Sequence, residues 1–105
     1  MGIGLLNSIR QLAGWPESPG PQLMDLREWR RLRDFSGLTQ REYEVCRLIF
    51  HGETRQAAAE SLGIADRTVR YHLEAAYSKL SVTNRVELVL RLIQIRDHLK
   101  RQARD

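Results

Sequence analysis

Apolar residues recur every three or four positions along most of the 105-residue chain, which is the spacing of amphipathic α-helices. No stretch alternates apolar and polar residues in the way that predicts a β-strand. The pattern therefore predicts an all-α fold. The expected helices cover about residues 3–13, 22–35, 40–51, 55–62, 67–80 and 84–99 or beyond.

A proline-rich segment divides this pattern near the N-terminus. Residues 15–21, WPESPGP, hold three prolines and a glycine, and proline blocks the continuation of a helix or strand. The segment must form a turn or linker. We therefore expect a short helical N-terminal extension with a Pro-rich turn, residues 1–37, followed by a domain of residues 38–105.

Capping signals mark two of the helix starts in that domain. Thr39, with Glu42 three residues later, forms a capping box pattern. Thr54 is expected to cap the next helix, and Gly52 and Gly63 to end the two helices that precede them.

The spacing of three small or branched residues predicts a helix-turn-helix. Where two helices cross closely, the residue of the first helix at the crossing must be small, and Ala59 is small. The turn must allow a left-handed backbone, as Gly63 does without steric cost. Val69 then supplies an apolar side chain from the second helix, so residues 55–80 match the motif.

The second of these helices separates into two faces at 100° per residue. One apolar face is expected in the core and carries Val69, Leu73, Ala76 and Leu80. The opposite side carries Arg67, Tyr71, Glu74 and Ser78, and Arg70 lies on one flank. A helix in the DNA major groove could use Arg67, Arg70, Tyr71 and Glu74 to contact base edges. The alternative is an ordinary solvated face.

Three segments between residue 38 and about residue 95 also resemble a known family. LTQREYEV, AAAESLGIADRTVRYHL and KLSVTNRVEL are similar, in order and spacing, to the DNA-binding domain of LuxR/FixJ/NarL (GerE-like) transcription regulators. The resemblance implies a four-helix domain whose third helix enters the major groove and whose fourth commonly forms a dimer. Ala65 stands where the family usually has a capping Ser or Thr, so we expect Asp66 to cap instead.

The resemblance also implies roles for individual residues. Base contacts would come mainly from Arg70, Tyr71 and Glu74. The residues implied to contact phosphates are Thr54, Arg55, Gln56, Thr68 and Lys79.

The last helix carries two apolar stripes, although a surface helix needs only one. The first stripe, expected in the core, holds Val86, Val89, Leu90 and Ile93. The second has heptad-like spacing and holds Leu88, Leu92, Ile95 and Leu99. We predict that a second copy of the chain covers it, so that Leu92→Asp gives a folded monomer. The alternative is that residues 3–35 fold back over it.

Charge and composition narrow the function. The net charge of +4 and a pI near 9.8 favour an anionic partner. Cys46 is the single cysteine, and no histidine has a second ligand at metal spacing. No residue set typical of catalysis is evident, so we expect no enzyme, metal, cofactor or small-molecule ligand. The single cysteine and the lack of an apolar run near the ~18 residues of a membrane span favour a cytoplasmic location, and the family resemblance implies a bacterial protein.

These observations lead to two hypotheses. The first is a sequence-specific regulator of transcription that binds double-stranded DNA as a homodimer. Only 37 residues precede Leu38, fewer than the ~100 of a sensing domain, so we expect a stand-alone regulator, the alternative being a fragment of a longer one. The second is a protein-interaction module that uses the same scaffold to bind RNA polymerase or another regulator.

Overall fold

The computed structural model describes residues 24–104, and within that range it is all-α, as predicted. The expected helix at residues 3–13 and the Pro-rich turn lie outside the described residues. The helices are α3 (Leu26–Ser36), α4 (Gln40–Phe50), α5 (Arg55–Leu62), α6 (Asp66–Leu80) and α7 (Arg85–Arg104).

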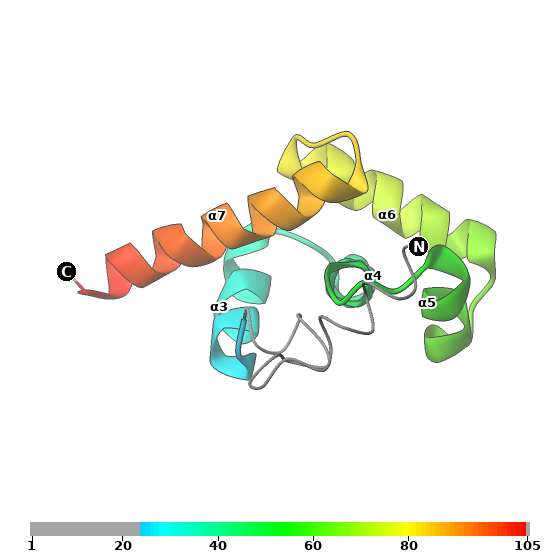
Figure 1. Cartoon of the computed structure of the whole chain (residues 1–105), viewed down its shortest axis with the longest axis horizontal. Coiled ribbons are helices and arrows are strands. Elements are labelled where there is room, and N and C mark those ends of the chain that lie inside the picture. The colour runs from blue at the N-terminus through cyan, green and yellow to red at the C-terminus, as the bar shows by residue number, and fades with distance from the viewer. Residues whose placement is uncertain (1–23, 105) are drawn as a thin grey trace, which may run out of the picture.

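The helices are arranged around α4, which is viewed end-on near the centre of Figure 1. Helices α5 and α6 lie on one side of α4, and α3 lies on the other. The long helix α7 starts beside the end of α6, runs across the molecule and packs against α3. Helix α4 itself packs against α5, α6 and α7, so it is the centre of the fold.

Side-chain caps begin most of these helices. Both predicted caps are confirmed: Thr39 and Glu42 form a reciprocal capping box on α4, and the Thr54 hydroxyl accepts from the Ala57 amide on α5. A second capping box, which the sequence analysis did not identify, joins Asp25 and Glu28 at the start of α3. Each cap satisfies amides that have no partner within the helix.

The prediction that Asp66 caps α6 is wrong. Ala65 occupies the N-cap position with an extended backbone, and no side chain bonds to the helix start there. Asp66 is the first residue of the helix itself, and its carboxylate lies 3.9 Å from the Arg55 guanidinium. As an acid in the first turn, it still interacts favourably with the helix dipole.

Helix α3 shares one hydrophobic core with the other helices. Trp29 is 1% exposed and meets the ring of Phe50 edge-on at a centroid distance of 5.0 Å. Leu32 and Met24 are also buried in this cluster. Gly37, in the left-handed conformation with φ 77°, ends α3 at the position predicted as the domain boundary. That boundary therefore falls inside one packed body.

The stripe that was predicted to form a dimer interface lies largely in this core. Leu88 and Leu92 are 0% exposed within the single chain, while Ile95 and Leu99 are half-buried. Helix α3 folds back on α7, which is the alternative considered for this stripe. A second chain is not needed to cover Leu88 and Leu92, and their assignment to a dimer interface is withdrawn.

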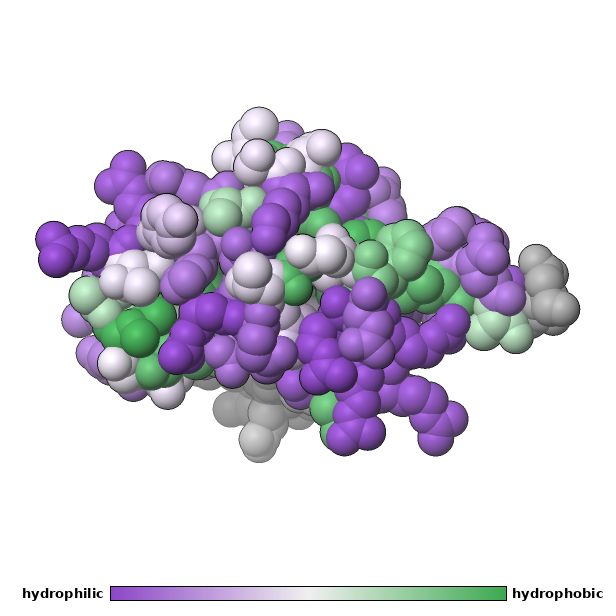
Figure 2. All heavy atoms as spheres, turned by 180° about the vertical axis from the view of Figure 1, so that it is seen from behind, coloured by the Kyte–Doolittle hydropathy of each residue, from purple (hydrophilic) through white to green (hydrophobic). Residues whose placement is uncertain are grey.

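Polar contacts hold α3 to the second half of α7. Arg31 donates to the Leu99 carbonyl at 3.0 Å, and Glu28 lies 3.8 Å from the Lys100 ammonium. The exposed apolar residues of α7 belong instead to the stripe expected in the core: Val86 is 67% exposed and Leu90 is 55% exposed. Figure 2 shows, from behind, apolar surface along α7 and hydrophilic side chains over α3.

Candidate nucleic-acid interface

The helix-turn-helix is present at the predicted residues. Helices α5 and α6 pack together, with Ala59 6% exposed and Val69 fully buried. Gly63 takes the left-handed conformation with φ 67°, and the Ile64 amide bonds back to the Ala59 carbonyl. This ends α5 within one residue and lets the chain turn directly into α6.

Helix α6 has the two faces that its periodicity predicts. The buried residues are Val69, Leu73, Ala76 and Leu80. The four candidate base-reading residues are all exposed: Arg67, Arg70, Tyr71 and Glu74. Tyr71 is 70% exposed, so its ring and hydroxyl are accessible to a partner. We call the surface of these four residues the α6 outer face.

Two residues of the α6 outer face are paired with each other. The Arg70 Nε donates to Glu74 Oε1 at 3.1 Å, one helical turn along α6. Both side chains remain about two-thirds exposed, with values of 64% and 63%. An exposed pair of this kind contributes little to folding stability, roughly 0.3–0.5 kcal/mol.

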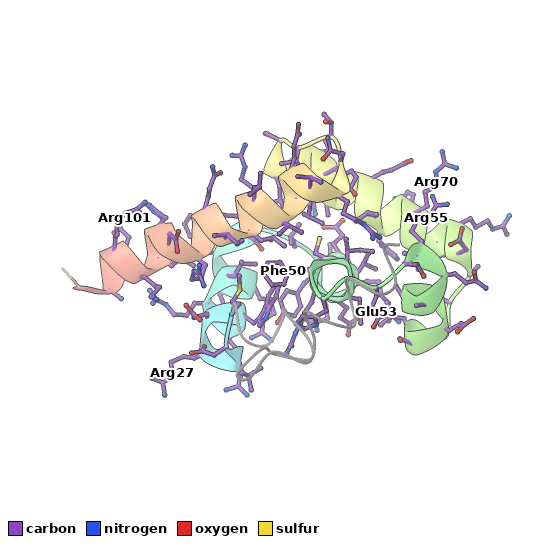
Figure 3. All side chains as sticks on the ribbon, viewed as in Figure 1. Arg27, Phe50, Glu53, Arg55, Arg70 and Arg101 are labelled. Atoms are coloured by element: carbon purple, nitrogen blue, oxygen red, sulfur yellow. The ribbon has the colours of Figure 1, made fainter. Side chains whose placement is uncertain are left out.

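A cleft of about 550 Å³ lies beside this pair and gathers positive charge. It is lined by Thr54, Arg55, Arg70, Leu73, Glu74, Tyr77 and Arg85. Three arginines from three different helices therefore surround one hollow. Figure 3 shows Arg55 and Arg70 at the same end of the molecule, far from Arg27 and Arg101.

The predicted phosphate-contacting residues of α5 lie at its N-terminus. Thr54, Arg55 and Gln56 are exposed there and line a neighbouring hollow with Asp66. The N-terminal end of a helix carries partial positive charge and unpaired amides, which favours a phosphate. These three residues and the α6 outer face are thus adjacent on the surface.

Arg85 belongs to this surface but had no role in the sequence analysis. Its Nη2 donates to the Glu53 carbonyl at 2.9 Å, which ties the start of α7 to the loop before α5. Burial raises the pKa of the neighbouring Tyr77, against the opposing effect of the Arg85 charge. The signal that could have found Arg85 is its place at the first position of the last helix.

Lys79 and Thr68 are the two predicted phosphate contacts that lie on α6 rather than at the α5 N-terminus. The Lys79 ammonium is 2.7 Å from Glu42 Oε1, in the first turn of α4, and is also bonded to the carbonyl of Gly37, where α3 ends. Burial acts to raise the pKa of Glu42, but hydrogen bonds from Lys79 and Thr39 bring it below its ordinary value. Lys79 therefore anchors α6 to α4, and Thr68 is half-buried in the first turns of α6.

The described residues contain no group of His, Cys, Asp or Glu side chains suited to a metal ion. None of the helices in residues 24–104 is long and apolar enough to cross a membrane. What the structure does present is a helix-turn-helix protein with a polar, arginine-bearing outer face on its second helix.

Comparison with known proteins identifies the family of this helix-turn-helix protein. The model of the luxR family of bacterial regulatory proteins matches residues 36–92, just over half of the chain. The chain belongs to this family, whose members are DNA-binding transcription regulators. The resemblance identified in the sequence is thereby confirmed.

Individual relatives are transcription regulators by name. The HTH-type transcriptional regulator MalT of Vibrio cholerae is 41% identical over 54 residues, which cover 51% of this chain and 6% of that protein. The transcriptional regulatory protein DesR of Bacillus subtilis is 32% identical over 87 residues, 83% of this chain and 42% of its own. The transcriptional activator protein AnoR of Acinetobacter nosocomialis is 34% identical over 58 residues, 55% of this chain and 24% of its own.

The chain spans less than half the length of each of these relatives. No solved structure matches it.

Proposed function

We propose that this protein is a sequence-specific regulator of transcription that binds double-stranded DNA in the bacterial cytoplasm. The observation that carries the proposal is the α6 outer face, where four polar side chains stand exposed beside a cleft lined by three arginines. Such a helix fits the major groove, where arginine can bind guanine at two atoms. The proposal includes no catalytic activity.

The two parts of this surface have different roles. Arg67, Arg70, Tyr71 and Glu74 contact base edges in the major groove. The α5 N-terminus contacts the phosphate backbone through Thr54, Arg55 and Gln56, with Arg85 as an added contact from α7. Lys79 holds α6 in place through Glu42, so that it supports the interface without reaching the phosphates.

The test is selection of the purified chain against random duplex DNA. We expect enrichment of a short sequence, arranged as two half-sites about one helical turn apart if the protein binds as a dimer. Recovery of no enriched sequence by a folded, helical protein would contradict sequence-specific binding.

The dimer in this proposal uses the exposed stripe of α7. Val86 and Leu90 are one turn apart and exposed, and Leu90 borders a hollow of about 170 Å³ that Glu87 and Arg91 also line. Opposite charges beside an apolar pair suit a self-complementary twofold interface. Two large apolar side chains on a surface helix gain free energy when a second copy covers them.

Light scattering on two aspartate variants tests the dimer. Leu90→Asp should convert a dimer to a monomer and weaken DNA binding. The matched control is Leu26→Asp on α3, because Leu26 is similarly exposed at 49%. A wild-type monomer at high concentration, or a dimer mass that Leu90→Asp leaves unchanged, would refute this interface.

A further inference from the structure

The ion pair between Arg70 and Glu74 lies at the centre of the surface proposed to contact bases. The bond uses Nε of the guanidinium and one carboxylate oxygen of Glu74. Both residues project from the exposed side of α6, and both line the arginine cleft. An exposed pair of this kind adds little to folding stability. Its relevance here is to binding, because it determines which donors and acceptors of the two side chains remain available.

The pair leaves the outer end of the Arg70 guanidinium available. An arginine has five N–H donors in a rigid planar fork, and Nε supplies one of them. The two terminal nitrogens keep the parallel N–H groups that guanine O6 and N7 accept. Holding Nε also restricts the long side chain before binding, so less conformational entropy is lost in the complex.

Glu74 contributes a second constraint because a carboxylate only accepts hydrogen bonds. In the major groove, the oxygens of guanine and thymine would repel it, and adenine places the acceptor N7 beside its amino group. Cytosine presents only an amino donor, which the carboxylate can accept without a neighbouring acceptor on the same base. The nearby arginines, Arg55 and Arg85, lie in the same cleft, so the negative charge of Glu74 is tolerated beside the DNA backbone.

We propose that Glu74 is a specificity-determining residue that acts with Arg70 as one unit. It orients the Arg70 guanidinium toward a guanine and selects a cytosine amino group for its own carboxylate. The unit therefore selects G·C pairs at its place in each half-site. This inference rests on the proposed DNA-binding function and adds the base chemistry to it.

The experiment compares base-preference profiles from random-duplex selection for the full chain and three variants. Glu74→Gln keeps the size of the side chain but can pair with adenine, so the cytosine preference should move to adenine. Glu74→Ala should lose it without gaining another. In Glu74→Ala, the preference for guanine at the Arg70 position should fall by about twofold, the factor expected when one exposed i,i+4 ion pair is lost.

The control is Glu44→Gln on α4. Glu44 also forms an ion pair with an arginine, Arg41, at 3.2 Å, and its substitution removes the same charge. Any general gain in affinity from lower repulsion should appear in this control, but its base profile should match that of the wild type. Because Glu74 is exposed, circular dichroism should show unchanged helix content in all variants.

Two results would overturn the inference, and they are distinguishable. If the wild type enriches a sequence but Glu74→Gln and Glu74→Ala both give the base profile of the wild type, the DNA-binding function stands and the role of Glu74 is refuted. If the folded wild type enriches no sequence, the proposed function fails and the inference falls with it.

Discussion

Helices α6 and α7 are both amphipathic, yet only one of them could be oriented from its periodicity. Helix α6 has a single apolar stripe, and all four of its members are buried. Helix α7 has two apolar stripes, and the structure buries Leu88 and Leu92 while it exposes Val86 and Leu90. The comparison teaches that one apolar stripe fixes the orientation of a helix, whereas with two stripes the orientation depends on the elements that pack against it.

Helix α7 packs against α3 as well as against α4 and α6. The buried Trp29 and Leu32 of α3 join the core cluster that contains Leu88 and Leu92. Hydrogen bonding and ionic contacts to Leu99 and Lys100 extend this packing along α7. Both α3 and the last twelve residues of α7 lie outside the segment that matches the family, except at residue 36.

The largest expected loss of stability distinguishes the buried apolar stripe of α7 from the exposed one. Leu92→Asp should unfold the protein, because it buries an unpaired charge and removes packing at a fully buried site, at a cost of about 5 kcal/mol or more. Leu90→Asp is the matched control and, at protein concentrations where the wild type is monomeric, should lose about 1 kcal/mol or less. Urea unfolding measures both. A folded Leu92→Asp monomer would restore the original assignment of this stripe to a dimer interface.

The next effect tests whether α3 is part of the core. Trp29→Ala should lower the free energy of unfolding by about 3–5 kcal/mol, because the indole is 1% exposed and packs edge-on against Phe50. Leu26→Ala, at a 49% exposed site on the same helix, should cost about 0.5 kcal/mol. Similar small losses for both variants in thermal denaturation would show that α3 does not support α7.

The smallest expected effect on stability comes from the ion pair between Glu42 and Lys79, which joins α4 to α6. Glu42→Gln preserves the capping box but removes the charge that pairs with Lys79. We expect a loss of about 1 kcal/mol or less near neutral pH, since Lys79 is 39% exposed. Because the folded-state pKa of Glu42 is lowered from 4.5, the stabilisation is complete above that pH and is lost as the pH falls through the lowered pKa.

Unfolding measured across this pH range checks that expectation. The difference between wild type and Glu42→Gln should shrink toward zero in acid. A difference that stays constant from neutral to acidic pH would mean that the ion pair does not contribute.

The parts that could be predicted from sequence depend on local signals. The caps at Thr39 and Thr54, the turn at Gly63 and the faces of α6 all follow from residues within one or two turns of each other. The same local rule failed at Asp66, where the extended backbone of Ala65 set the helix start.

The remaining parts depend on contacts between distant segments. Lys79 meets Glu42 across 37 residues, and Arg85 meets the Glu53 carbonyl across 32. Neither spacing has a signature in the sequence, so the sequence analysis identified neither the contact of Lys79 with Glu42 nor that of Arg85 with Glu53. The cover of α7 by α3 was one of two alternatives, because periodicity shows that a stripe needs cover but not what covers it.

The central claim is that the α6 outer face binds DNA, and the affinity of Arg70→Ala for the selected duplex tests it most directly. Fluorescence anisotropy at several salt concentrations should show a loss of about 1–3 kcal/mol for this variant, with wild-type affinity falling steeply as salt rises. Arg27→Ala, at an exposed arginine on the opposite end of the molecule, should bind as the wild type does. Equal affinity for Arg70→Ala and the wild type, or equal losses for both variants, would contradict the assignment of this face.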